Sequence, residues 1–172
     1  MVVPNFTAPS TSQIKYTWIG HATAVIQIGP DNFIIDPNFI EKKKTSRYRP
    51  AACKISELPP IDVVLISHDH TDHTHVPSLE ELNKRYQPTF FMGLGSEDVL
   101  PKGSKQKTMD WMETYTIKLK GGEYKITFLP TCHWARRWIH DLNTRLWGAF
   151  LVESPFGHKF YYSGDTGYAG VF

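Results

Sequence analysis

Residues 61–75 read IDVVLISHDHTDHTH, an apolar run followed directly by interleaved histidines and aspartates. The run Ile61–Ser67 is mostly apolar, which predicts a central β-strand covered on both faces. Four of the chain's eight histidines lie between positions 68 and 75. Imidazole and carboxylate groups are the ligands that first-row divalent cations such as zinc select. The stretch therefore predicts a metal-binding loop projecting from a rigid sheet edge, and a metal-dependent hydrolase is the first hypothesis.

Strands are predicted upstream of this loop, and a helix directly after it. Residues 15–20, 23–28 and 33–36 are β-type runs separated by turn residues, which predicts an antiparallel meander. Ser78 and Glu81 form a capping-box pattern, which predicts a helix from Ser78 to about Tyr86. Beyond it we expect a short strand at 90–92 and a helical turn at 96–100.

The second half of the chain is predicted to be mostly strand. Four segments alternate or carry β-branched and aromatic residues, namely 114–119, 124–130, 147–153 and 159–163. Gly121-Gly122 and the segment 155–157 mark hairpin turns between them. The whole pattern indicates an α+β fold in which two β-sheets pack face to face with helices outside.

The bulk properties indicate one globular domain. The chain has 172 residues, of which 41% are hydrophobic and 21% charged, and a net charge of +2. We expect residues 1–13 to be a flexible lead-in and residues 14–172 to be the domain. The low charge argues against nucleic acid as a partner. Two cysteines, no apolar span of membrane length and no signal-peptide pattern predict an intracellular protein, soluble or peripherally bound to a membrane.

A basic cluster lies between the meander and the central strand, and two interpretations of it remain open. It consists of Lys42, Lys43, Lys44, Arg47 and Arg49. Such a run is commonly a solvated loop. It also has the charge expected of a patch that faces an anionic membrane or substrate.

Two further strand ends offer metal ligands. His133 follows the predicted strand 124–130, and Asp165 follows the strand 159–163 between two glycines. A glycine-flanked aspartate is also an ordinary turn, so each position alone is a weak signal. Their recurrence at strand ends predicts that they share a cleft with the histidine-rich loop.

Other polar residues near strand ends have two interpretations each. His21 and Asp36 are either turn residues or supports that hydrogen-bond the free ring nitrogen of a ligand. Arg136 and Arg137 follow His133 and either meet a substrate phosphate or form a solvated face.

The motif formed by His68, His70, Asp72 and His73 resembles the HxHxDH signature of the metallo-β-lactamase superfamily. Further segments are similar to the branch of N-acylphosphatidylethanolamine-hydrolysing phospholipases D: TWIGHAT at 17–23, ISELPPID at 55–62, CHW at 132–134, LWG at 146–148 and SGDTGY at 163–168. The resemblance spans about residues 14–172.

This resemblance implies an αβ/βα sandwich that holds two zinc ions. By motif, His68, His70 and His133 hold one zinc, Asp72 and His73 hold the other, and Asp165 bridges them. Asp72 is also expected to orient the attacking hydroxide and is the candidate catalytic residue. The implied reaction is hydrolysis of N-acylphosphatidylethanolamine to an N-acylethanolamine and phosphatidic acid. A phospholipid substrate and peripheral membrane contact follow from it, whereas the oligomeric state stays open.

The chain departs from the family pattern after Asp165, where only seven residues follow and none is histidine. We therefore expect an incomplete second half, a more weakly held second zinc with three protein ligands, and an open edge with an uncovered apolar face at strand 159–163. Two alternatives to the phospholipase remain: another hydrolase of this fold, such as a lactonase acting on a sugar phosphate, or a catalytically inactive metal-binding protein.

Overall fold

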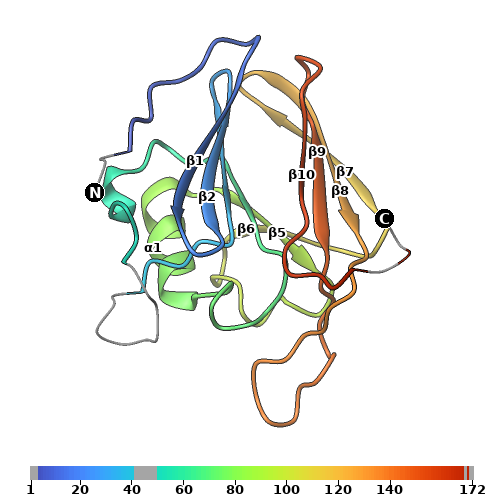
Figure 1. Cartoon of the computed structure of the whole chain (residues 1–172). Coiled ribbons are helices and arrows are strands. Elements are labelled where there is room, and N and C mark those ends of the chain that lie inside the picture. The colour runs from blue at the N-terminus through green and yellow to red at the C-terminus, as the bar shows by residue number, and fades with distance from the viewer. Residues whose placement is uncertain (1–3, 41–49, 169, 171–172) are drawn as a thin grey trace.

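The computed structural model describes residues 4–40, 50–168 and 170, and over these residues it forms two β-sheets that face each other (Figure 1). The first sheet has the order β1-β2-β3-β4-β5-β6. Its strands are β1 Ile14–Gly20, β2 Thr23–Ile28, β3 Asp31–Ile35, β4 Val63–Leu65, β5 Thr89–Gly93 and β6 Lys105–Met109. The 3-10 helix η2 (Ile55–Glu57) and the α-helix α1 (Val76–Tyr86) lie on its outer face.

The second sheet has the order β10-β9-β8-β7 and is antiparallel throughout. Its strands are β7 Thr114–Leu119, β8 Gly122–Leu129, β9 Ala149–Glu153 and β10 Lys159–Tyr162. The predicted α+β class, with two sheets face to face, is confirmed. The predicted N-terminal meander is also confirmed, because β1, β2 and β3 pair antiparallel.

Strand direction brings the functional residues to one edge of the sandwich. Strands β3, β4, β5 and β6 are parallel, so their carboxyl ends meet at one edge of the first sheet. Because β1 runs in the same direction as β3, the β1–β2 turn lies at this edge too. The strands β8 and β10 likewise share a direction.

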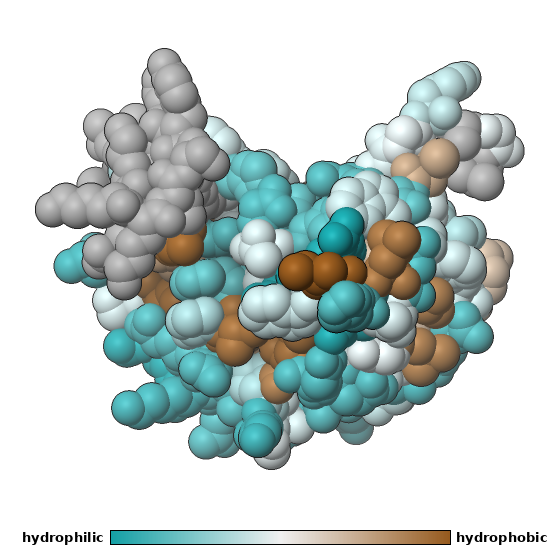
Figure 2. Space-filling view, turned by 90° about the horizontal axis from the view of Figure 1, so that it is seen from below, coloured by the Kyte–Doolittle hydropathy of each residue, from teal (hydrophilic) through white to brown (hydrophobic). Residues whose placement is uncertain are grey.

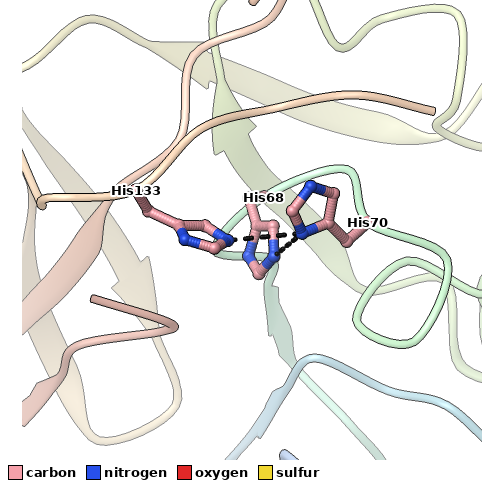
Figure 3. Close-up of side chains that lie close together, drawn as sticks. All are labelled: His68, His70 and His133. Atoms are coloured by element: carbon pink, nitrogen blue, oxygen red, sulfur yellow. Dashed lines mark hydrogen bonds between the residues drawn. The ribbon is translucent and has the colours of Figure 1, made fainter. Parts of the chain in front are cut away.

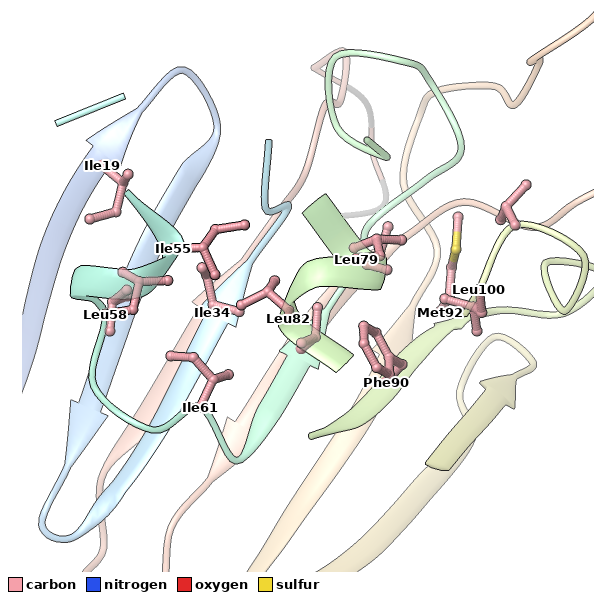
Figure 4. Close-up of a cluster of buried hydrophobic side chains, with 14 residues drawn as sticks. Ile19, Ile34, Ile55, Leu58, Ile61, Leu79, Leu82, Phe90, Met92 and Leu100 are labelled. Carbon is pink, nitrogen blue, oxygen red and sulfur yellow. The ribbon is translucent and has the colours of Figure 1, made fainter. Parts of the chain in front are cut away.

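The predicted central strand is confirmed, and its two faces pack against different layers. Val63 and Leu65 of β4 face the second sheet and share the inter-sheet core with aromatic residues such as Phe128 and Phe150. Val64 faces the other way, into the core that Leu79 and Leu82 of α1 close (Figure 4). All three β4 side chains are fully buried. Strand β4 therefore delivers the histidine-rich loop from the most rigid part of the fold.

The helix after this loop begins two residues earlier than the capping box predicts. It starts at Val76, with His75 as the N-cap residue and Pro77 in the first turn. Proline suits that position because its φ is helical and its missing N–H has no helical partner there. The hydroxyl of Ser78 instead accepts a hydrogen bond from the Phe39 backbone N–H at 2.9 Å. It thereby ties the helix to the segment after β3.

Two strand assignments also differ from the sequence prediction. Strand β6 was not predicted, because its residues KQKTM are mostly polar, as suits a strand at the edge of its sheet. Strand β9 begins at Ala149 rather than at 147, because the Gly148 N–H donates to the carbonyl of Ser67 across the sandwich. At residues 96–100 the structure has a hydrogen-bonded turn instead of the expected helical turn, and the Val99 N–H donates to the carbonyl of Ser96.

The outer face of the second sheet bears no helix among the described residues, and β10 lies at the edge of the sheet. The expected apolar face is present only in part, because Leu151 and Tyr161 point outward among charged side chains. Glu123, Lys125, Glu153 and Lys159 point outward from β8, β9 and β10, and Lys159 pairs with Glu153. Charges along an edge oppose pairing with a second sheet.

Residues 4–13 contain no helix or strand and make specific contacts with the domain. The carbonyl of Phe6 accepts a hydrogen bond from Gln27, and the carbonyl of Thr11 bonds to His158. The basic cluster from Lys42 to Arg49 lies outside the described residues. Among the described residues, no helix combines the length and the apolarity needed to cross a bilayer.

Candidate metal centre

The structure brings all the predicted ligand residues to one edge of the sandwich. His68, His70, Asp72 and His73 lie in the loop between β4 and α1. His133 lies beyond β8 and Asp165 beyond β10. His133 and Asp165 follow His73 by 60 and 92 positions, and the packing of the two sheets places them against the loop.

Three imidazoles form the first cluster, and their nitrogens converge (Figure 3). Nε2 of His68 lies 2.9 Å from Nδ1 of His70, and Nε2 of His133 lies 3.3 Å from the same atom. The other nitrogen of His70, Nε2, is buried and has no hydrogen-bond partner among the described residues. The ring therefore makes its polar contacts through Nδ1, on the side of the cluster.

The tautomer of His68 follows from its neighbours. The hydroxyl of Ser67 donates to Asp36 at 2.6 Å, so its oxygen is left to accept the hydrogen on Nδ1 of His68 at 2.9 Å. The lone pair of His68 is then on Nε2, which faces the cluster. A ligand histidine held in this way by its second nitrogen is the usual arrangement at metal sites.

Electrostatics keep these imidazoles neutral, the form that binds a metal. Burial, together with the neighbouring imidazoles His73, His70 and His133, lowers the pKa of His68 to about 2. Burial also lowers the pKa of His70 and of His133. Three neutral imidazoles with converging lone pairs match the three-histidine sites that hold zinc and leave a fourth position open.

Asp72 and His73 form a second cluster beside the first. Nε2 of His73 lies 3.7 Å from Oδ2 of Asp72, and that oxygen lies 2.9 Å from Nε2 of His21. Burial favours the neutral carboxyl, but the charge of His73 and the hydrogen bond from His21 lower the pKa of Asp72. Ionised carboxylate and imidazole again form a donor set suited to a divalent cation.

Asp36 supports this cluster from behind. Its carboxylate is fully buried and accepts hydrogen bonds from four groups: Ser67 N–H at 2.8 Å, Ser67 hydroxyl at 2.6 Å, His73 Nδ1 at 2.6 Å and Tyr162 hydroxyl at 2.5 Å. Burial opposes protonation of His73, but the hydrogen bond and charge of Asp36 raise its pKa. Because both of its oxygens accept hydrogen bonds, Asp36 is placed to hold the ring of His73 in one orientation, as the support role requires.

Asp165 lies between the two clusters. Its Oδ1 is 3.4 Å from Nε2 of His73, and its Oδ2 is 4.0 Å from Nε2 of His133. Gly164 permits this approach: its φ is +59°, and a Cβ there would lie 2.6 Å from the Cβ of Ser67. Each oxygen of the carboxylate thus faces a different cluster, as a bridging ligand requires.

A buried ion network, which the sequence analysis missed, fixes the loop that carries His133. Arg145 donates to Asp69 at 3.1 Å, to Asp141 at 2.7 Å and to Asp98 at 2.6 Å. Asp69, one of the two variable positions of the motif, also accepts the Arg136 backbone N–H at 2.8 Å. The network therefore joins the loop beyond β8 to the histidine-rich loop.

The two arginines after His133 were candidates for binding a substrate phosphate, and in the structure both donate to backbone carbonyls of the chain. Arg137 donates to the backbone carbonyls of Asp69 and Thr74, at 3.0 and 2.9 Å. Arg136 is exposed, and its Nε donates to the carbonyl of Trp138. Arg137 is thus used to hold the two loops together. Nothing in its local sequence separates this role from phosphate binding.

Two facing sheets with paired histidine and aspartate clusters at one edge define the class of proteins with the metallo-β-lactamase fold. The chain belongs to the beta-lactamase superfamily domain family, whose model matches residues 31–170. The predicted membership of this superfamily of metal-dependent hydrolases is therefore confirmed.

Two relatives indicate a branch within the family. The chain is 31% identical over 186 residues to "N-acyl-phosphatidylethanolamine-hydrolyzing phospholipase D 1" of Caenorhabditis elegans, covering 98% of the chain and 52% of that protein. It is 28% identical over 166 residues to the mitochondrial phospholipase D of the same description in Saccharomyces cerevisiae, covering 92% and 36%. The chain spans about half the length of the worm relative.

Solved structures share the fold. Igni18, described as a metallo hydrolase of Ignicoccus hospitalis, superposes with a TM-score of 0.67 at 21% identity, covering 91% of this chain and 63% of that one. An isothiocyanate hydrolase from Delia radicum gut bacteria superposes with a TM-score of 0.65 at 18% identity, covering 91% and 64%. At these identities the likeness concerns the fold alone.

Proposed function

We propose that the chain is a zinc-dependent phosphodiesterase that hydrolyses N-acylphosphatidylethanolamine to an N-acylethanolamine and phosphatidic acid. The convergence of the first cluster, the second cluster and Asp165 at one edge carries this proposal. The names of the worm and yeast relatives support the choice of substrate. In this assignment His68, His70 and His133 hold one ion, Asp72 and His73 hold the other, and Asp165 faces both.

Paired divalent cations supply an activated water and polarise phosphoryl oxygens when they are bound. The residues of the chain position the reacting groups around them. Asp72 is half exposed, and its Oδ2 lies 2.9 Å from Nε2 of His21, so its carboxylate is placed at the open side of the site, where it can accept a hydrogen bond from a water and orient it. The ring of Trp134 packs edge-on against His70, with centroids 4.3 Å apart, and shields that ligand from solvent. Asp36 holds the ring of His73 in one orientation.

Turnover of two substrates by the zinc-loaded 172-residue protein tests this function. We expect a long-chain N-acylphosphatidylethanolamine in detergent micelles to give N-acylethanolamine and phosphatidic acid in equal amounts. In ¹⁸O-labelled water the label should enter the phosphate, because the bond broken joins phosphorus to the ethanolamine oxygen. Protein stripped with a chelator is the control. Turnover of a sugar-phosphate lactone with none of the lipid would establish the lactonase alternative, and no turnover with tightly bound zinc would indicate an inactive metal-binding protein.

We also propose that the loop after His133 contacts the lipid surface from which the substrate comes. This loop projects from the site edge of the molecule (Figure 1), and the view from that side shows apolar residues grouped among polar ones (Figure 2). Trp138, Ile139 and Leu142 are 68%, 76% and 57% exposed. Exposed apolar side chains beside a cation such as Arg136 suit the interface of an anionic bilayer.

The loop is held in shape before any lipid binds. One carboxylate oxygen of Asp141 accepts the backbone N–H groups of Arg137 and Trp138, at 3.0 and 2.6 Å. The backbone of Asn143 donates to the carbonyl of Ala135 at 2.7 Å. A rigid apolar tip loses little conformational freedom on insertion, which favours binding.

The double variant Trp138→Ala/Ile139→Ala tests this surface. Burying either side chain contributes about 1.5–3 kcal/mol, so we expect at least a tenfold loss of affinity for vesicles containing anionic phospholipid. Co-sedimentation measures it. Tyr16→Thr is the control, because Tyr16 is comparably exposed, at 62%, on the edge strand β1. Unchanged vesicle binding by the double variant would contradict the proposal.

A further inference from the structure

His21 is a third imidazole at the second cluster, and the superfamily motif does not include it. It lies in the turn between β1 and β2, 51 positions before Asp72. Nonetheless His21, Asp72 and His73 each offer a ligand atom within 4.8 Å of the others. The rings of His21 and His73 meet edge to face, with centroids 5.5 Å apart. The fold therefore adds one imidazole to the aspartate and histidine that the motif supplies.

We propose that His21 is a ligand of the second metal ion, together with Asp72, His73 and Asp165. This inference rests on the metal site of the proposed function and adds a residue to it. The second ion then has four protein ligands, as the first has with His68, His70, His133 and Asp165. Four is the number typical of tetrahedral zinc.

The other contacts of His73 and Asp72 leave their ligand atoms available beside His21. Nδ1 of His73 is engaged by Asp36, so its Nε2 is the atom that faces Asp72 and Asp165, at 3.7 and 3.4 Å. Asn38 fixes the backbone of the loop by donating to the carbonyl of Asp72 at 2.9 Å. The ligand atoms of His21, Asp72 and His73 therefore lie together, and Asp165 approaches the same group through Nε2 of His73.

The backbone at His21 is held in an uncommon conformation that directs the ring toward this cluster. Its φ is +53°, in the left-handed region that residues other than glycine seldom adopt. The indole N–H of Trp18 donates to the carbonyl of His21 at 2.8 Å and clamps the turn. Strained positions of this kind concentrate at functional sites, where the surrounding structure maintains them.

A hydrogen bond from His21 to Asp72 is the alternative role, and His21→Gln separates it from metal ligation. Glutamine places an N–H donor at a similar distance from the backbone, but its amide nitrogen has no lone pair for a metal. Glutamine tolerates a positive φ no better than histidine does, so the substitution does not relieve the backbone strain at this position. A positioning role would survive this substitution, and a ligand role would not.

Calorimetric titration of the metal-free protein with zinc measures both sites. We expect His21→Gln to leave the first site unchanged and to weaken the second by more than the roughly 10–100-fold typical of losing an outer hydrogen-bond partner. His158→Gln is the matched control, because His158 lies in the β9–β10 turn and its ring nitrogen Nε2 bonds the Thr11 carbonyl, far from the metal ligands in the sequence. It should leave both affinities unchanged.

A spectroscopic readout follows the ring itself. In protein labelled with ¹⁵N-histidine, the second equivalent of zinc should shift Nε2 of His21 together with Nε2 of His73. A second zinc that shifts His73 and leaves His21 unmoved, or that binds His21→Gln with undiminished affinity, would overturn the inference and leave the proposed function standing. Protein that binds no zinc at all would overturn both.

Discussion

Replacing Arg145 with methionine is expected to lower the free energy of unfolding by about 3–5 kcal/mol. Arg145 is buried and faces three carboxylates, of which Asp69 is itself fully buried. Methionine fills similar space without a charge, so the buried Asp69 would lose its ion partner. An uncompensated buried carboxylate is among the most destabilising defects in a folded protein.

Urea denaturation of the variant and the parent protein measures this loss. Lys159→Met is the control, because Lys159 pairs with Glu153 on the exposed face of the second sheet. Exposed ion pairs contribute about 0–1 kcal/mol, so this control should hardly change stability. A similar small change for both variants would show that the Arg145 network contributes little to stability.

The same substitution should weaken the first metal site. Asp69 joins the histidine-rich loop to the loop beyond β8, through Arg145 and the Arg136 backbone. Without that link His133 is no longer held against His68 and His70. Zinc titration of the variant, under conditions where it remains folded, should therefore show a weaker first site. A folded variant with full zinc affinity would show that His133 is positioned independently of the network.

The second large effect is expected for Asp36→Asn, which should reduce zinc affinity at the second cluster by about 10–100-fold. One oxygen of Asp36 accepts hydrogen bonds from Ser67, His73 and Tyr162, and the other accepts the Ser67 backbone N–H. An asparagine amide group must point its NH₂ at one of these donor sets. In either orientation Nδ1 of His73 loses its charged acceptor, so the orientation and tautomer of the ring are held less firmly.

Asparagine is a close match to aspartate in every other respect at this position. The φ of Asp36 is +37°, and asparagine tolerates positive φ about as well as aspartate. Tyr162→Phe is the control, since it removes one of the four donors and leaves His73 bonded to Asp36. We expect it to reduce stability by about 1 kcal/mol and to leave zinc affinity nearly unchanged. Equal zinc affinities for Asp36→Asn and the parent protein would refute the support role.

Much of the architecture could be predicted because its signals are local. The apolar run before His68 indicated a buried strand, and β4 is that strand. Alternating patterns located nine of the ten strands, whereas β6 was missed because an edge strand needs no apolar face. The helix start was misplaced because Ser78 bonds Phe39, a partner distant in sequence, rather than capping the helix.

The candidate site also has a part that local sequence predicts and a part that depends on the tertiary structure. His68, His70, Asp72 and His73 are close because they are neighbours along one loop, so their spacing alone predicted a cluster of candidate metal ligands and, through it, the superfamily. His21, Asp36 and Arg145 reach that cluster from 31 to 76 positions away. These three residues meet the cluster only because of the order of the strands, their parallel register and the packing of the two sheets face to face. Those arise from packing over the whole domain, which no short segment of sequence encodes.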